Sequence, residues 1–207
     1  TLDRWVADAA RTAAGRGVTG IVDLDMGGNV DAWQRRIRGG LRSWRVRACL
    51  YPVDLGLARR RGLRSGELVP QTGGLATVGW FKLFTDGALN SRTAWCADPY
   101  PGATGAHDHG LPSYADGELL EAAREAVAAG LVPTIHAIGD RAVTQALDVF
   151  TELVIPRGAL LPPRMEHAQL VADADLPRFG RLGIHASVQP EHAMDDLGLL
   201  DDDDLPP

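Results

Sequence analysis

The stretch Val132–Leu153, VPTIHAIGDRAVTQALDVFTEL, contains the pattern that decides the fold. It opens on a short run of apolar and β-branched residues that ends at His136, as a buried strand does. From Arg141 onward the apolar residues recur at every third and fourth position, which is typical of an amphipathic helix. A strand followed directly by a helix is the repeating unit of a parallel sheet. The sequence therefore predicts an α/β fold.

The same alternation continues on both sides of this stretch. The predicted strands are Val18–Leu24, Val46–Tyr51, Trp80–Thr85, Val132–His136, Arg164–His167 and Ile184–Gln189. The predicted helices are about Leu2–Arg16, Val30–Arg38, Asp116–Ala129, Arg141–Leu153 and Asp173–Leu182. Gly17, Gly130 and Gly183 each come just before a predicted strand, where a helix can end in the left-handed conformation that glycine adopts at little cost. We expect one domain with six parallel strands and the helices outside them.

The composition is that of an ordinary globular protein and argues against several classes of function. With 45% hydrophobic and 23% charged residues, the 207-residue chain can bury one substantial core. The net charge of -6 and the short arginine clusters around Arg36 and Arg60 argue against a nucleic-acid partner. The apolar runs are shorter than the roughly 20 residues that span a bilayer, so we expect no membrane association. Cys49 and Cys96 form no disulfide framework, which favours a reducing, cytoplasmic compartment.

The segment Asp86–Pro112 interrupts the alternation of strands and helices. It is rich in glycine, proline, alanine and small polar residues and shows no clear periodicity. Loops of this length inside compact domains usually have a function. The segment follows the third predicted strand and would therefore lie at the carboxyl end of the sheet, where parallel α/β folds keep their active sites. We expect it to be a long loop on the substrate side.

Three predicted strands carry, at or near their carboxyl ends, a residue suited to a metal site: Lys82, His136 and His167. Imidazole nitrogen is a common ligand of zinc, whereas lysine becomes a ligand only when carbon dioxide carbamylates its amine. Singly, each residue has a plainer explanation, because strand-end histidines often belong to the core and a lysine in an apolar strand can extend to water. Parallel strands of one barrel, however, bring their carboxyl ends together. The set of three therefore predicts one metal site.

The remaining histidines receive no ligand role. His107 and His109 have the spacing of a metal-binding pair, but no apolar strand precedes them to point both side chains the same way. We expect a solvated turn in the long loop there. His185 alternates off the predicted ligand face, and His192 lies beyond the last predicted strand.

Five short motifs in fixed order resemble the amidohydrolase superfamily, and in particular its amidohydrolase 3 branch, which includes N-substituted formamide deformylases. They are KLFTDGAL at Lys82–Leu89, SRTA at Ser91–Ala94, HAIGDRAV at His136–Val143, RMEHAQ at Arg164–Gln169 and SVQPEH at Ser187–His192. The resemblance runs from about Gly17 to the end of the chain.

This resemblance implies a TIM-like (β/α)8 barrel that holds one or two divalent metal ions, usually zinc. Lys82 resembles the carbamylated lysine of the family, and His136 and His167 resemble two of its metal-ligating histidines. The six strands would be strands two to seven, so the 207 residues would be the central part of the catalytic domain. The family's His-x-His pair and its catalytic aspartate would then lie outside the chain. We accordingly expect weak or absent metal binding, no activity from the isolated chain, and possible self-association through its exposed sheet edges.

The resemblance also implies the reaction, which is metal-dependent hydrolysis of small-molecule amides or other non-peptide C–N bonds. Asp140 is expected to cap a helix that begins at Arg141, and Asp86 is expected to form a tight turn with Gly87. The resemblance suggests that both aspartates border the active site, which makes them secondary catalytic candidates. The alternative is a noncatalytic or degenerate α/β-barrel binding domain, in which the same histidines are structural or bind a small anion.

Overall fold

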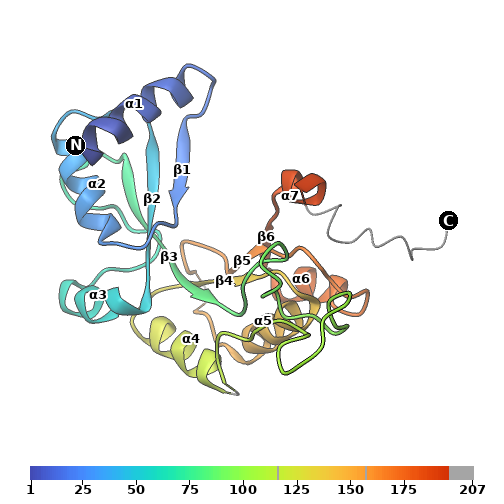
Figure 1. Cartoon of the computed structure of the whole chain (residues 1–207). Helices are drawn as coiled ribbons and strands as arrows, with labels where there is room; N and C mark the ends of the chain where they lie inside the picture. Colours follow the sequence, from blue (N-terminus) through green and yellow to red (C-terminus); the bar gives the residue numbers. More distant parts are fainter. Residues whose placement is uncertain (116, 157, 196–207) are drawn as a thin grey trace. The chain divides into compact units, whose positions relative to one another are not determined.

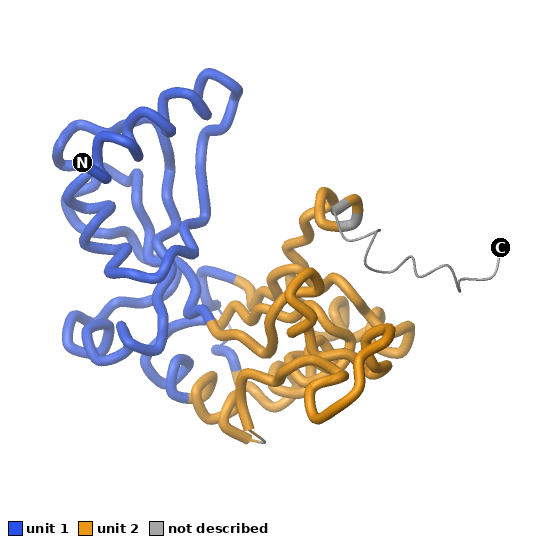
Figure 2. Tube along the Cα trace, in the orientation of Figure 1, with its two compact units in different colours: residues 1–82, 125–132, 155–161 blue, residues 83–124, 133–154, 162–207 orange. Residues whose placement is uncertain are grey.

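The computed structural model describes residues 1–115, 117–156 and 158–195. The chain divides into two compact units (Figure 2). The first consists of Thr1–Lys82, Glu125–Val132 and Ile155–Leu161, and the second of Leu83–Arg124, Pro133–Val154 and the residues from Pro162 onward. None of the described helices has both the length and the apolar character that a membrane span requires.

Six strands form one sheet in the order β1-β2-β3-β4-β5-β6, labelled in Figure 1. The pairs β1–β2, β2–β3, β4–β5 and β5–β6 are parallel. Parallel strands that neighbour one another in chain order, with helices between them, are the arrangement of a TIM-like barrel. The prediction of an α/β fold that is part of such a barrel is confirmed.

The first unit contains the elements before the long loop. They are α1 (Leu2–Ala14), β1 (Gly20–Asp23), α2 (Asn29–Arg38), β2 (Arg45–Leu50), the 3-10 helix η1 (Pro52–Asp54), α3 (Leu55–Arg61) and most of β3 (Ala76–Phe84). Ile37 of α2, Ala48 of β2 and Val78 of β3 are buried in its core. Asp3 of α1 accepts hydrogen bonds from Arg35 and Arg36 of α2, and these bonds lower the pKa of its carboxyl to about 2.

The second unit carries the elements around the candidate site. They are the end of β3, the start of α4 (Glu118–Ala128), β4 (Pro133–Ala137), α5 (Asp140–Glu152), β5 (Arg164–His167), α6 (Leu176–Leu182), β6 (His185–Ser187) and α7 (Pro190–Asp195). Strand β4 is buried along its whole length. The helix α5 buries Val143, Leu147 and Phe150, a spacing that places them on one face, and it packs against β4. Burial of such side chains stabilises the fold by about 1.5–3 kcal/mol each.

The strand predictions are correct in number and order but not at every boundary. Strand β5 has the predicted bounds, whereas β3 begins at Ala76, four residues before the predicted start. Gly79 interrupts the apolar run there, and the structure gives the reason: a Cβ at Gly79 would lie 3.0 Å from the backbone of Ala48 in β2. The glycine thus permits β2 and β3 to approach closely, and the sequence around Gly79 does not reveal this approach.

Two short α-helices were not predicted, nor was the 3-10 helix η1. The α-helices are α3 and α7, which have seven and six residues, too few for a clear helical period. The predicted start of α4 at Asp116 lies outside the described residues.

The segment that contains the expected long loop has neither helix nor strand in residues 86–115. Backbone hydrogen bonds hold it in place within the second unit. The amide of Gly87 donates to the Thr93 oxygen at 3.1 Å, and that of Ser113 donates to the Thr85 oxygen at 2.7 Å. The loop is therefore folded back onto the end of β3.

Candidate metal site

His136 and His167 come together at the carboxyl ends of two neighbouring strands. Their ring centroids are 4.5 Å apart at an interplanar angle of 70°. The parallel register pairs His136 with Glu166, and Ala137 with His167. In regular strands His136 and His167 would therefore point to opposite faces of the sheet.

The backbone at the end of β5 explains how the two rings meet. His167 and Ala168 have φ angles of 73° and 46°, in the left-handed region that residues other than glycine seldom adopt. This conformation breaks the strand alternation just where the ring of His167 leaves the sheet. It costs about 1–3 kcal/mol per residue and persists only when the surroundings impose it, as they often do at functional sites. One such restraint is the bond from the Ala168 amide to the Ala137 oxygen, at 3.0 Å.

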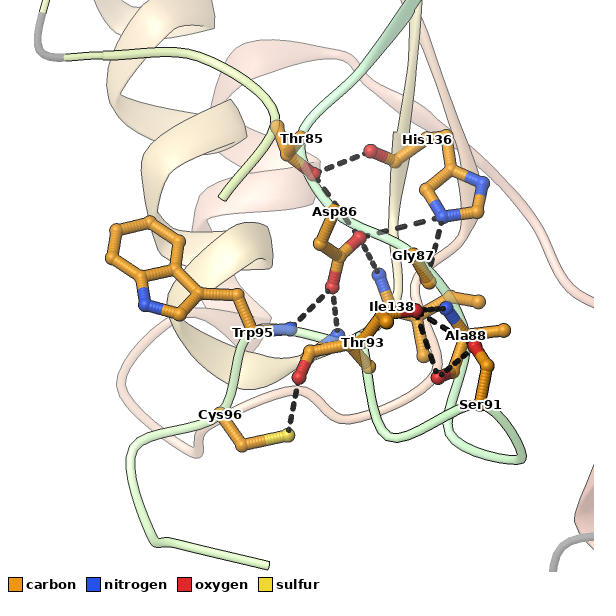
Figure 3. A network of polar contacts seen from close by, with 12 residues as sticks. Thr85, Asp86, Gly87, Ala88, Ser91, Thr93, Trp95, Cys96, His136 and Ile138 are labelled. Carbon is orange, nitrogen blue, oxygen red and sulfur yellow. Dashed lines mark hydrogen bonds and ion pairs between the residues drawn. The ribbon is translucent and has the colours of Figure 1, made fainter. Parts of the chain in front are cut away.

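His136 is 8% exposed, and its Nε2 atom faces two oxygens. The Gly87 carbonyl oxygen lies 3.0 Å from Nε2, and Asp86 Oδ1 lies 3.4 Å from it (Figure 3). With the proton on Nε2 the ring donates to the Gly87 oxygen, and Nδ1 then carries the lone pair that a metal ion requires. The aromatic ring of Phe84 packs beside the imidazole with a centroid distance of 5.2 Å.

Asp86 is a buried hydrogen-bond acceptor, with a side chain 0% exposed. Its Oδ2 accepts the amides of Gly139 at 2.8 Å and Trp95 at 2.9 Å, and its Oδ1 accepts the Ile138 amide at 3.1 Å (Figure 3). The predicted tight turn at Asp86 and Gly87 is wrong, because neither residue is in a turn. The side chain bonds to amides far along the chain instead of folding back on its own backbone.

Asp140 accepts a free amide at the start of α5, as predicted, and it also binds the long loop. The helix α5 begins at Asp140 itself with Gly139 at the N-cap, so the predicted helix start at Arg141 is one residue late. Asp140 Oδ1 accepts the amide of Ala97 at 2.7 Å and that of Arg141 at 2.9 Å. Through these two hydrogen bonds Asp140 connects the long loop to the start of α5.

Lys82 lies in the first unit, near the end of β3, and is 3% exposed. The adjacent residue Phe81 donates its amide to the Val132 oxygen at 2.9 Å, which pairs this part of β3 with the segment just before β4. His136 and His167 belong to the second unit, whereas Lys82 belongs to the first, and each unit is described by itself.

The donor chemistry of the second unit fits part of a metal site. Two imidazoles lie side by side, and one of them has its Nε2 atom held by oxygen acceptors in the manner of metal-ligating histidines. Within the described residues, no three histidine, cysteine, aspartate or glutamate side chains form a group that could hold a metal ion. A complete site would therefore need at least one donor of another type or from another segment.

The other histidines divide into two kinds. His107 and His109 lie in a turn, as predicted, and His109 Nδ1 is 3.2 Å from the Cys96 oxygen. The sequence gives no ligand role to His192, yet its ring stacks on His167 with a centroid distance of 5.5 Å and an interplanar angle of 14°. The available signal was its position in the SVQPEH segment, directly after a strand of the sheet.

A cavity of about 560 Å³ opens beside the start of α5. Its lining includes Leu89, Tyr100, Asp140, Gln169 and Leu170. Burial raises the pKa of the Tyr100 phenol, so this side chain is neutral in the physiological range. A cavity of this size with mostly apolar walls and a few polar groups suits a small molecule.

The strand order is that of a TIM-like barrel, and the sequence comparison gives the family. Residues 1–207 match the amidohydrolase family, and the chain belongs to this family. It is 31% identical over 204 residues to Protein LONG AFTER FAR-RED 3 of Arabidopsis thaliana, an alignment that covers 91% of this chain and 33% of the relative. It is 29% identical over 205 residues to YtcJ of Bacillus subtilis (strain 168), a proposed amidohydrolase by name, with 95% and 36% covered.

The chain is also similar to a solved structure. A metal-dependent hydrolase from Pyrococcus horikoshii OT3 superimposes with a TM-score of 0.77 at 31% sequence identity, over 94% of this chain and 38% of that protein. The chain thus spans between 33% and 38% of the length of these relatives.

Proposed function

We propose that this chain contributes to the active site of a metal-dependent hydrolase that cleaves amide or other non-peptide C–N bonds of small molecules. The observation that carries the proposal is the 4.5 Å pairing of the His136 and His167 rings at adjacent strand ends. Family membership and the likeness to a metal-dependent hydrolase support it. So does the left-handed backbone at His167, a strained conformation that is expected where function requires it.

His136 and His167 would hold a divalent metal ion, for which zinc is the best candidate because imidazole nitrogen is among its usual ligands. The family resemblance adds Lys82 as a third ligand in its carbamylated form. When bound, such an ion polarises both water and a substrate carbonyl. The chain's own residues orient the His136 imidazole, since the Gly87 oxygen accepts a hydrogen bond from Nε2 and leaves Nδ1 as the nitrogen with a lone pair.

The cavity beside α5 supports a small-molecule substrate. Its apolar residues would take the body of the substrate, and Gln169, two positions after His167, would offer an amide to a polar group. The long loop supplies much of the cavity wall, which fits the expectation that Asp86–Pro112 lies on the substrate side.

The first experiment measures metal binding to the 207-residue chain by zinc titration in a calorimeter. We expect weak binding that is lost in His136→Ala and in His167→Ala, because each change removes a donor. The matched control is His185→Ala, which removes an exposed imidazole from β6. Equal zinc binding by the histidine variants and the control would disprove the ligand assignment.

The second experiment measures hydrolysis by the natural full-length protein. The substrates are a panel of N-substituted formamides and related amides. His136→Ala and His167→Ala should abolish zinc-dependent turnover, while His185→Ala should leave it intact. Full activity after removal of all metal would instead favour a noncatalytic role for these histidines.

A further inference from the structure

Asp86 is a buried group to which the proposed reaction assigns no task. An ionised carboxylate can accept about four hydrogen bonds. Three backbone amides, from Ile138, Gly139 and Trp95, already donate to Asp86. Two further groups lie 3.4 Å from Oδ1, the Thr85 hydroxyl and His136 Nε2 (Figure 3). Because its side chain is 0% exposed, Asp86 cannot reach a substrate as an acid or base.

We propose that Asp86 is a positioning residue that fixes the tautomer and the orientation of His136. This inference rests on the proposed function in so far as His136 is a metal ligand. Asp86 then has a positioning role in place of the catalytic role for which the sequence made it a candidate. The group acts through His136 and through the backbone that carries it.

The tautomer follows from the two groups that face Nε2. The Gly87 carbonyl oxygen can only accept a hydrogen bond, and Asp86 Oδ1 is used as an acceptor by the Ile138 amide. A ring nitrogen between two acceptors must carry its proton. The lone pair is then at Nδ1. The negative charge of the carboxylate also favours the proton on Nε2, the ring nitrogen that it faces.

The orientation follows from the backbone contacts of the same carboxylate. Ile138 and Gly139 come two and three residues after His136, so their bonds to Asp86 hold the chain just beyond the ring. The hydroxyl of Thr85, next to Asp86, donates to the His136 backbone oxygen. The side chain and its neighbour therefore restrain the backbone at the carbonyl of His136 and just beyond it.

The change Asp86→Asn tests the proposal because no orientation of the amide satisfies the site. If the NH₂ group replaces Oδ2, it faces the donating amides of Gly139 and Trp95. If it replaces Oδ1, it faces the Ile138 amide and the His136 proton. The matched control is Asp148→Asn, which removes one charge from an exposed side chain of α5 that pairs with Arg178.

The first measurement needs no Asp86 variant. Long-range nitrogen–proton NMR spectra of the metal-free 207-residue chain report which ring nitrogen of each histidine is protonated. Signals that disappear in His136→Gln belong to His136. We expect the form with the proton on Nε2, and a dominant form with the proton on Nδ1 would overturn the proposal whether or not Asp86→Asn folds.

The second measurement is zinc affinity by calorimetry, with near-ultraviolet circular dichroism to verify the fold. Loss of a group that orients a ligating histidine typically weakens metal binding by about 10-fold to 100-fold. We expect a loss of that size in Asp86→Asn and none in Asp148→Asn. A folded Asp86→Asn that binds zinc as the unaltered chain does would overturn the proposal. If the unaltered chain binds no zinc, the proposed ligand role fails, and the NMR result alone decides whether Asp86 sets the state of His136.

Discussion

A single methyl group at residue 139 tests how closely the long loop packs on the start of α5. A Cβ at Gly139 would lie 2.1 Å from the Trp95 backbone oxygen, a contact that only movement of the backbone can relieve. Forcing extra volume into such a place costs about 1–3 kcal/mol. We therefore expect Gly139→Ala to lower the free energy of unfolding by that amount in urea titrations.

The matched control is Gly180→Ala in α6. A Cβ there meets nothing within 4 Å, and alanine is favoured over glycine inside a helix by about 1 kcal/mol. The control should be neutral or stabilising. If both variants were equally stable, the close approach between Trp95 and Gly139 would make no contribution to the free energy of unfolding.

At the scale of residues, only part of the candidate site can be predicted from the sequence. The residue types of His136 and His167 and their positions at strand ends predict that they converge, and the structure brings their rings together. The left-handed backbone at His167 is not predictable from a histidine at the end of a short strand. Nor are the bonds of Asp86, whose amide partners at Ile138 and Gly139 lie more than fifty residues along the chain.

At the scale of elements, β5 holds a buried ion pair next to the candidate site. Arg164 Nε lies 2.7 Å from Glu166 Oε1, and the Glu166 side chain is 3% exposed. The hydroxyl of Thr134 in β4 donates to the same carboxylate, and Arg164 also donates to Ser187 in β6. The pair thereby connects three neighbouring strands.

Removal of the arginine should be costly because it leaves a buried charge without its main partner. Arg164→Met is expected to lower the free energy of unfolding by about 3–5 kcal/mol at neutral pH. The double variant Arg164→Met/Glu166→Gln should recover part of this loss, because it removes the buried charge as well. Chemical unfolding of the single and double variants measures the coupling, and additive effects would argue against a direct interaction.

The elements themselves were largely predictable because their signals are local. The β4–α5 unit shows its strand and its helical period within twenty-two residues. The long loop was recognised by the absence of any period, but its hydrogen bonds to β3 and α5 depend on contacts between distant residues. Short elements such as α3 carry too little periodicity to be seen in the sequence.

At the scale of the whole chain, the ends of the sheet decide how it behaves in solution. Within the described residues, β1 neighbours β2 alone and β6 neighbours β5 alone. A strand with one neighbour presents unpaired amides and carbonyls that can pair with a second copy of the chain. Charged side chains on such a strand oppose this pairing, and β6 offers an exposed position at Ala186.

We therefore expect the 207-residue chain to associate with itself in a concentration-dependent way, and we expect Ala186→Lys to weaken that association. The added ammonium would have to lose its water when a second strand pairs with β6, and two copies would repel each other. Size-exclusion chromatography with light scattering gives the mass directly. Ala9→Lys adds the same charge on an exposed position of α1, away from the sheet edge, and should leave the mass unchanged. A monomer at all concentrations would show that the strand edges do not pair, whereas equal effects of the two lysines would assign the change to net charge and not to the edge of β6.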